Sequence, residues 1–360
     1  MLRRRAFTLI ELLVVVAIIG ILATVVVVNL SSAQNKARDS KIKADLVTIQ
    51  KEANLYYLSD PNYTSLKCDP AACEGLVTSA SEELKQIGRA AKDINSIFTN
   101  TEDKLQIVSG VNFFAATAKQ VTSPSSYYYI EQNSSVSDSI KGNGQASFLK
   151  FPSNSYASVP INLNSFGNSD FTWSVKFTLK SGATADYARI IDGGAQSGAG
   201  LSGFIIARLL NSDTFVRAGI HDANDNFPMV NATTAAGYDQ LHTVVLAKTS
   251  SPTNRFTVYY DGAKVSSTPI ALATPNIARD FPAILFGSVG GTSGFGGNIY
   301  DVKFWKRSLG DGEAQSIHSG GLPYDIASWW NFKDGNGTVL TDVIGGKNGT
   351  IANPVWGNGI

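Results

Sequence analysis

Charged side chains are scarce in this chain, at 16% of its 360 residues, which is a low share for a cytosolic globular protein. Lysine plus arginine (30) and aspartate plus glutamate (29) nearly cancel and leave a formal charge of +1. A nucleic-acid partner requires a basic patch, and no basic run follows the N-terminus, so we expect no such partner. Low charge with abundant Ser, Thr, Asn and Gly is typical of an exported β-protein.

The residues that usually carry catalysis are also scarce. Glu313 is the only glutamate beyond Glu131, so no strand there supplies the pair of glutamates that glycosidases hold either about 5–5.5 Å or about 6.5–9.5 Å apart. His221, His242 and His318 show no metal-ligand spacing, and no G-x-S-x-G sequence lies between a predicted strand and helix. We therefore expect neither an enzyme nor a resident cofactor, and we interpret His242 as a structural strand residue.

Cysteine occurs only twice, as Cys68 and Cys73. Redox and zinc motifs use a shorter C-x-x-C spacing, and two further zinc ligands are missing nearby. Two interpretations remain, a pair of reduced thiols or a small disulfide that closes a loop after export. An exported protein favours the disulfide.

The strongest positive signal lies at the N-terminus. Arg3, Arg4 and Arg5 precede an unbroken uncharged run from Leu12 to Val28. As a helix this run would be about 26 Å long, close to the hydrocarbon thickness of a bilayer, and the arginines would keep the leader cytoplasmic. A secretory signal should end in a small-residue cleavage site, and none is obvious here. A plain membrane anchor stays an alternative.

Glu11 begins this apolar run, where an unpaired carboxylate is costly. Its surroundings, Ala6-Phe-Thr-Leu-Ile-Glu11 followed by LLVVVAIIGILA, resemble the class III signal of type IV pilins and pseudopilins. The resemblance implies cleavage by a prepilin peptidase between Ala6 and Phe7, and methylation of the new N-terminus at Phe7. It also implies a role for Glu11 in filament assembly, because its carboxylate would neutralise the α-amine of Phe7 in a neighbouring subunit.

The chain departs from that family in two places. Ala6 replaces the usual glycine, which suggests slower processing, and Thr24 to Val28 contains no proline, so we expect no kink. Beyond the run, apolar residues continue at helical spacing: Ala33, Ala37, Ile42, Leu46, Ile49 and Ala53. The predicted segments are a leader at 1–6, one long helix at 7–58 with 12–28 as membrane or filament core, a small pilin-like head at 59–131, and a β-domain at 132–360.

Within the predicted head, Ser81-Glu82-Glu83 is typical of a helix N-terminus and predicts a helix to about Phe98. Short strands are predicted at Leu105–Val108 and Tyr127–Glu131. In the β-domain, Phe171 to Leu179 alternates between apolar and polar residues, which predicts a strand. Further strands are predicted at Gly203–Leu210, Phe215–His221, Leu241–Lys248 and Arg255–Tyr260, with a hairpin turn at Asp261-Gly262.

Three stretches of the β-domain, Leu241–Val265, Ile284–Gly321 and Trp329–Ile351, resemble laminin-G-like, concanavalin A-like jelly rolls. The last stretch is usual near the start of such domains, so its C-terminal place implies a permuted order or a final strand that closes the sandwich. The fold class is therefore α+β: a long pilin helix with a small pilin-like head, followed by an all-β concanavalin A-like jelly-roll sandwich. This fold hosts lectins, adhesins, hydrolases and spacers, so it does not fix a function.

Two features of the β-domain are candidate ligand sites. Asp222, Asn224 and Asn226 follow a D-x-N-x-N pattern that could bind calcium, although the glycine and late glutamate of an EF-hand loop are absent. A polar hairpin turn is the alternative. Trp305, Trp329, Trp330 and Trp356 could stack on sugars, but large aromatic residues are usual in sandwich cores.

Together these features predict a type IV pilin-like filament subunit that displays its jelly roll outside the cell for adhesion or for binding glycans or surfaces. The predicted partners are other pilin subunits, in a homo- or hetero-polymer, the prepilin peptidase/methyltransferase, and the inner membrane before assembly. We expect the precursor in the cytoplasmic membrane and the mature chain in an extracellular pilus. A type II secretion pseudopilin and a membrane-anchored carbohydrate-active enzyme stay open as alternatives.

Overall fold

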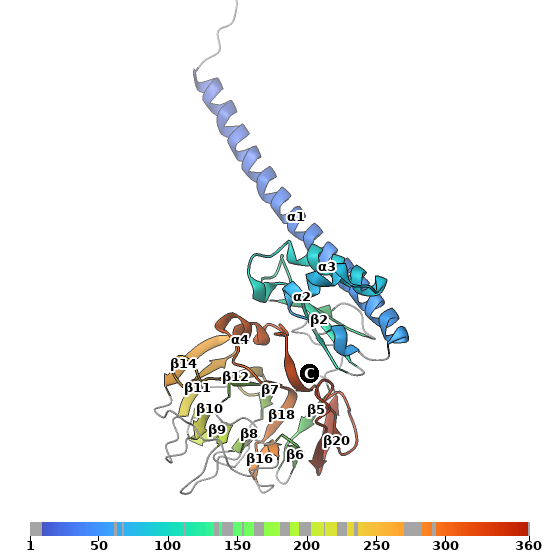
Figure 1. The fold of residues 1–360 in the computed structure, drawn as a ribbon. Coiled ribbons are helices and arrows are strands. Elements are labelled where there is room, and N and C mark those ends of the chain that lie inside the picture. The colour runs from blue at the N-terminus through green and yellow to red at the C-terminus, as the bar shows by residue number, and fades with distance from the viewer. Residues whose placement is uncertain are drawn as a thin grey trace, which may run out of the picture.

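The computed structural model describes residues 9–60, 63–66, 68–110, 113–124, 126–132, 137–138, 147–152, 155–161, 169–180, 188–193, 203–211, 213–221, 229–233, 237–269, 283–289 and 293–358. These residues form three consecutive parts: a long helix, a small head with a four-stranded sheet, and a large β-sandwich (Figure 1). The predicted fold class, a long N-terminal helix with a small head followed by a sandwich, is confirmed.

The N-terminal helix α1 (Leu9–Ser59) runs for 51 residues without interruption, as the absence of proline predicts. Its first part projects away from the rest of the molecule (Figure 1), and the first buried side chain in the described chain is that of Asp39. Ala33 and Ala37, which we expected on the same stripe as the later apolar residues, are exposed. The reason is that the head covers the helix only from Asp39 onward.

The second half of α1 forms one wall of the head. Its buried apolar residues, Ile42, Leu46, Ile49 and Ala53, recur every three or four positions and are fully buried. They pack in one core with helix α3 (Glu82–Asn95). The Ser81 hydroxyl accepts a hydrogen bond from the Leu84 amide (3.3 Å) and caps α3, as the sequence predicts.

The rest of the head consists of short helices and strands that pack on α1 and α3. Its remaining elements are η1 (Tyr63–Leu66), α2 (Pro70–Gly75), η2 (Leu76–Thr78), η3 (Thr101–Asp103), β1 (Gln106–Ser109), β2 (Phe114–Lys119), β3 (Tyr127–Glu131) and β4 (Ser137–Asp138). The four strands pair antiparallel in the order β1-β2-β3-β4. Strand β4 lies beyond the predicted head boundary at residue 131, so the head sheet takes residues that the composition assigned to the β-domain.

The sandwich consists of two antiparallel sheets and one helix. We call one the head-side sheet, with strands β14 (Ala263–Pro269), β13 (Arg255–Tyr260), β12 (Leu241–Thr249), β7 (Phe171–Leu179), β18 (Gly297–Trp305), β5 (Ser147–Lys150) and β22 (Val355–Asn358) in this order, and β19 (Ile326–Trp330) beside β18. We call the other the far sheet, with β11 (Met229–Thr233), β10 (Asp213–His221), β9 (Gly203–Asn211), β8 (Ala188–Asp192), β15 (Ile284–Phe286), β6 (Tyr156–Val159), β21 (Gly349–Ala352) and β20 (Val339–Leu340). Helix α4 is Asp311–His318, and β16 (Ser288–Val289) pairs with β17 (Ser293–Gly294).

Stacked aromatic rings fill the space between the sheets. Trp173 of β7 is fully buried, with its ring centroid 4.6 Å from that of Phe304, 5.4 Å from Phe204 and 6.1 Å from Trp330. Large aromatic rings supply much of the buried apolar area of a sandwich. Trp330 thus has the predicted core role, and Trp356 packs half-buried against the same core. Trp305 and Trp329 are buried as well, but in a separate core between the head and the sandwich.

The last strands of the chain complete both sheets. Strand β21 pairs with β6 in the far sheet, and β22 pairs with β5 in the head-side sheet. The C-terminal stretch thus closes the sandwich, which was one of its two expected roles. The hairpin between β13 and β14 turns at Asp261 and Gly262, whose φ angles of 47° and 79° are those that the predicted Asp-Gly turn requires.

Candidate functional site

The exposed part of α1 is the first candidate site. From Leu9 to Leu30 its large apolar side chains are 45–78% exposed, and the most apolar window of the helix has no buried residue. By length and composition this helix could cross a membrane. A helix that is apolar all round requires a bilayer or other apolar helices around it, so the monomer leaves this surface without a partner.

Several predicted site residues lie outside the described residues or at their edge. Ala6 and Phe7 precede the described residues. Glu11 lies in α1, but its side chain is not among the described parts of the structure. The proposed calcium residues Asp222, Asn224 and Asn226 lie in the stretch between β10 and β11, outside the described residues. Cleavage, methylation, the role of Glu11 and calcium binding therefore stay predictions.

Three polar side chains of α1 attach the head to the helix. Asp39 accepts hydrogen bonds from the amides of Val121 (2.7 Å) and Thr122 (3.0 Å). In the C-terminal part of the helix, Gln50 donates to the Glu131 carbonyl at 2.5 Å, and Asn54 donates to the Gln132 carbonyl at 2.9 Å. Sequence periodicity could not identify these contacts, because each partner lies about 80 positions away in the chain.

Cys68 and Cys73 are joined by a disulfide, with their Cα atoms 5.2 Å apart. Cys68 also forms an antiparallel bridge with Ile107 of β1. Next to this loop, Asn95 of α3 donates to the Pro70 carbonyl (3.1 Å) and accepts from the Leu105 amide (2.9 Å). The disulfide loop is therefore a structural brace between α3 and the head sheet.

A second core joins the head to the head-side sheet, and we call it the joint. Its buried members from the head are Val108, Phe113, Ala115 and Tyr129, and those from the sandwich are Val245, Tyr259, Trp305, Leu309, Ala314, Ile317, Leu322, Ile326 and Trp329. The ring of Phe113 meets that of Trp329 edge-on, with centroids 5.1 Å apart. Gly110 also comes close to the sandwich: a Cβ atom there would lie 2.5 Å from the Val343 carbonyl oxygen.

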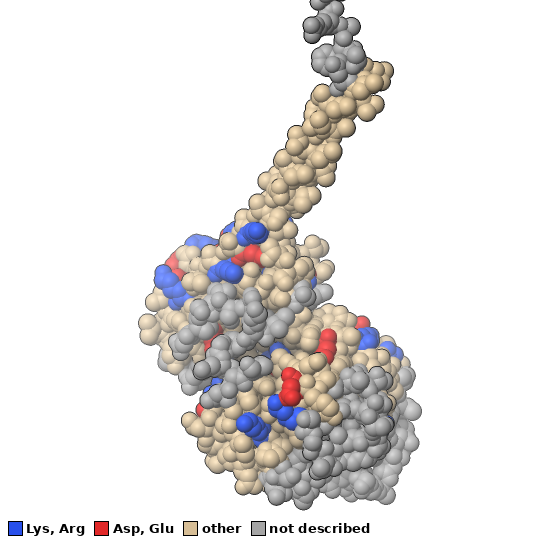
Figure 2. Space-filling view, turned by 180° about the vertical axis from the view of Figure 1, so that it is seen from behind, with Lys and Arg blue, Asp and Glu red and all other residues tan. Residues whose placement is uncertain are grey.

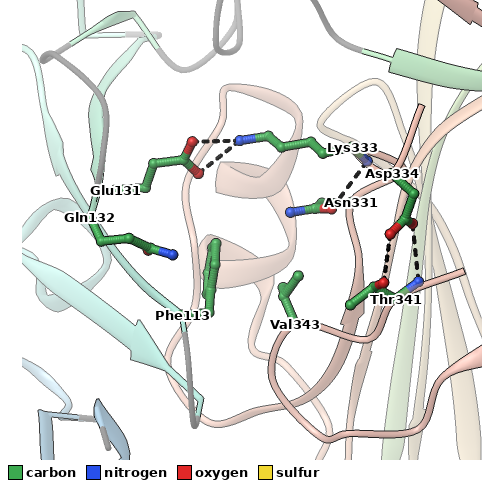
Figure 3. Close-up of a pocket in the computed structure, with 8 residues that line it drawn as sticks. All are labelled: Phe113, Glu131, Gln132, Asn331, Lys333, Asp334, Thr341 and Val343. Atoms are coloured by element: carbon green, nitrogen blue, oxygen red, sulfur yellow. Dashed lines mark hydrogen bonds and ion pairs between the residues drawn. The ribbon is translucent and has the colours of Figure 1, made fainter. Parts of the chain in front are cut away.

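Polar groups surround a cavity of about 250 Å³ at the edge of the joint (Figure 3). Lys333 of the sandwich donates to both carboxylate oxygens of Glu131 in the head at 2.7 Å. The Asp334 carboxylate accepts from the amide (3.1 Å) and the hydroxyl (2.5 Å) of Thr341. The carboxylates of this cavity thus already bind protein donors, and the Lys333–Glu131 pair is an ion pair between the head and the sandwich.

His242, which we expected to be a structural strand residue, is buried in β12. Its Nδ1 lies 2.8 Å from Asp261 Oδ2 and its Nε2 lies 3.0 Å from the Gly237 carbonyl. Burial lowers the pKa of His242, but the bonds to Asp261 and Gly237 outweigh it and raise the pKa above the usual value. Both ring nitrogens are engaged, so the ring joins β12 to the β13–β14 turn through Asp261 and to the segment before β12 through Gly237. Among the described residues, no group of three His, Cys, Asp or Glu side chains is arranged for a metal.

Two family models match the parts of the chain seen above. The prokaryotic N-terminal methylation motif matches residues 1–27, and the concanavalin A-like lectin/glucanases superfamily matches residues 151–315. The chain is a pilin-like or pseudopilin-like protein with a concanavalin A-like domain. The class III signal and the exposed apolar helix of this pilin-like protein are consistent with a place in a membrane or a pilus.

Curated relatives of this pilin-like protein match its N-terminal part. The type II secretion system core protein G of Klebsiella pneumoniae is 36% identical over 81 residues, which cover 22% of this chain and 56% of that protein. The type IV wide pilus major component PilA4 of Thermus thermophilus is 40% identical over 86 residues, covering 21% of this chain and 66% of PilA4. The chain spans 40–56% of the length of the core proteins G of Klebsiella pneumoniae, Dickeya chrysanthemi and Pectobacterium carotovorum.

Solved structures are similar to the larger part of the pilin-like protein at low identity. A putative carbohydrate binding protein from Bacteroides ovatus is 15% identical, with a TM-score of 0.46, over 69% of this chain and 70% of its own. A heptameric SAP-like pentraxin from Limulus polyphemus is 14% identical, with a TM-score of 0.40, over 61% of this chain and 96% of its own. At these values neither similarity bears on function.

Proposed function

We propose that this chain is a subunit of a type IV pilus-like filament that displays its sandwich outside the cell. The observation that carries the proposal is the exposed apolar surface of α1 from Leu9 to Leu30, which no other described part of the chain covers. In the cytoplasmic membrane the bilayer would cover it, and in a filament the same helices of neighbouring subunits would do so. The partners are then other pilin subunits, and a prepilin peptidase releases Phe7 as the new N-terminus.

The sandwich is proposed to bind glycans or other surface ligands and to act in adhesion, without catalysis. The joint uses only the head-side sheet, helix α4 and nearby loops of the sandwich, so the far sheet lies on the side away from the head (Figure 1). In a filament built on α1, the far sheet would be the face of the sandwich that is turned away from its own head. The joint also holds the sandwich at a fixed angle, which suits a displayed binding domain better than a flexible tether does.

The test is quantitative mass spectrometry of filaments sheared from cells that express the chain. We expect an N-terminal peptide beginning with methylated Phe7, together with peptides of the sandwich. A dominant signal identifies a major subunit whose sandwich coats the fibre, and a trace signal identifies a minor or tip subunit. Absence of the chain from sheared filaments contradicts the proposal.

A matched pair of variants tests the role of the exposed helix. Ile19 (58% exposed) and Leu58 (80% exposed) are apolar side chains on the same helix α1, but only Ile19 lies in the uncovered apolar segment. Because a lysine in the middle of such a segment costs about 2.5–3.5 kcal/mol on insertion, Ile19→Lys should remove the chain from filaments. Leu58→Lys should leave incorporation unchanged, and equal losses in both variants would argue against this role of the segment.

The second candidate function is a type II secretion pseudopilin, which the similarity to core protein G favours. The same experiment separates the two functions, because a pseudopilin would be processed and methylated but retained in the cell envelope. Retention in the envelope together with sugar hydrolysis by the purified chain would instead support an anchored carbohydrate-active enzyme.

A further inference from the structure

Basic side chains gather where the free part of α1 meets the head (Figure 2). We call Lys36, Arg38, Lys41 and Lys43 the basic collar; all four are exposed. Lys41 pairs with Asp93 of α3 at 3.0 Å, and Lys43 lies over the ring of Tyr128. Lys36 and Arg38 make no ion pair with any described residue, so two charges of the collar face outward without a partner on this chain.

The acidic residues of the same stretch do not neutralise these two charges. Asp39 is buried and accepts hydrogen bonds from the amides of Val121 and Thr122. Asp45 is half-buried, and Asp93 pairs with Lys41. The four basic side chains of the collar and these three carboxylates leave a net charge of +1, and the outward-facing charges at this rim of the head are those of Lys36 and Arg38.

The position of the collar along α1 matches the headgroup layer of a bilayer. Leu30 is the last large exposed apolar residue of the uncovered segment, and Lys36 follows about 9 Å further along the helix. The polar layer of each leaflet is about 5–7 Å thick, and side chains on a helix point back toward its N-terminus. With the apolar segment in the hydrocarbon, the charges of Lys36 and Arg38 lie at the level of the lipid phosphates.

The distribution of the collar around the helix favours lipid over a single protein partner. At about 100° per residue, Lys36 and Lys43 lie on one side of α1, and Arg38 and Lys41 lie on the opposite side. A neighbouring subunit would approach from one side, whereas a headgroup layer surrounds the helix. We propose that the basic collar binds anionic phospholipid headgroups at the outer surface of the cytoplasmic membrane and seats the head on the bilayer before assembly.

This proposal rests on the membrane stage of the proposed function, but its main test, binding to vesicles, needs no filament. The fragment 31–360 retains every described core residue, since the head core begins at Ile42. Co-sedimentation would compare its binding to vesicles of phosphatidylcholine with and without phosphatidylglycerol. The double variant Lys36→Gln/Arg38→Gln should bind the phosphatidylglycerol vesicles about 30-fold more weakly, which corresponds to about 1 kcal/mol for each charge, and added salt should abolish the difference.

The matched control is Lys51→Gln/Lys347→Gln, which removes the same net charge from two exposed lysines far from the collar. It should bind like the unmodified fragment, and Lys36→Arg/Arg38→Lys should retain binding because it keeps both charges. Equal weakening by both glutamine pairs, or no weakening by the collar pair, overturns the proposal. A third outcome also overturns the proposal: Lys36→Gln/Arg38→Gln leaves vesicle binding of the fragment unchanged but removes the full-length chain from filaments. The collar would then bind carboxylates of a neighbouring subunit.

Discussion

At the scale of single residues, the contact between His242 and Asp261 makes the stability of the sandwich depend on pH. The raised pKa of His242 means that the folded chain holds this proton more tightly than the unfolded chain, whose histidines titrate at about 6.5. The stabilisation is complete below that pH and is lost as the pH rises through the folded pKa. A charged hydrogen bond of this kind contributes about 1.5–3 kcal/mol.

We therefore expect His242→Gln to lower the free energy of unfolding most at acidic pH and progressively less above neutrality. Urea unfolding over a pH series measures this. His318 is the control, because burial lowers its pKa despite the nearby Asp261; the neutral ring is favoured there, and its contribution is lost as the pH falls. His318→Gln should therefore change the pH slope in the opposite direction, and parallel slopes in both variants would refute the assignment.

Glu11 carries a second prediction at this scale. If its carboxylate neutralises the α-amine of Phe7 in a neighbouring subunit, Glu11→Ala leaves a buried amine without a partner, which is costly. The variant should be cleaved and methylated normally but should enter filaments poorly. Mass spectrometry of membrane and sheared fractions measures both steps. Normal incorporation of Glu11→Ala into filaments would show that Glu11 does not pair with the Phe7 amine during assembly.

At the scale of elements, Gly110 tests how closely the head and the sandwich approach each other. A Cβ atom at Gly110 would collide with the backbone of Val343, whereas a Cβ atom at Gly75 would meet nothing within 4 Å. Overpacking of this kind costs about 1–3 kcal/mol. Gly110→Ala should therefore destabilise the fragment 31–360 in urea, while Gly75→Ala should be neutral or slightly stabilising. Equal effects would mean that the joint is looser than described.

The elements themselves were largely predictable, but their contacts were not. Helix α3 and strands β7 and β12 follow directly from capping and alternation, because those patterns depend on near neighbours. The polar face of β7 was expected to be distinct from the core, yet Thr172, Ser174 and Thr178 are at most 3% exposed. No local pattern could show this, because the elements that cover the head-side sheet lie more than 100 positions away or in the head.

The same reasoning applies to the candidate sites. The exposed apolar helix was visible in the sequence, because a bilayer or filament core imposes a composition on consecutive residues. The Lys333–Glu131 pair was not visible, because its two residues are 202 positions apart, and neither has an unusual neighbourhood. The head boundary at 131 followed a shift in composition, but strand pairing extends the head sheet to Asp138.

At the scale of the whole molecule, the joint makes the head and the sandwich one mechanical unit. Buried residues from both parts share one core, and the Lys333–Glu131 pair spans its edge. A force applied to a displayed sandwich would then pass through the joint, the head and the polar contacts of Asp39, Gln50 and Asn54 into α1. Cutting the chain at residue 132 would expose the joint, so binding and stability are best measured on the fragment 31–360.

Calorimetry of that fragment tests whether the two parts unfold together. We expect one cooperative transition, because neither part buries its side of the joint alone. Phe113→Ala removes an aromatic ring from the joint and should cost about 3–5 kcal/mol, splitting the transition into two. Phe256→Ala removes an equally buried ring from the sandwich core; it should lower the transition temperature without splitting it. Two transitions in the unmodified fragment would show that the head and the sandwich unfold independently, so that the joint does not couple them. A single transition in Phe113→Ala would show that the coupling does not depend on the Phe113 ring.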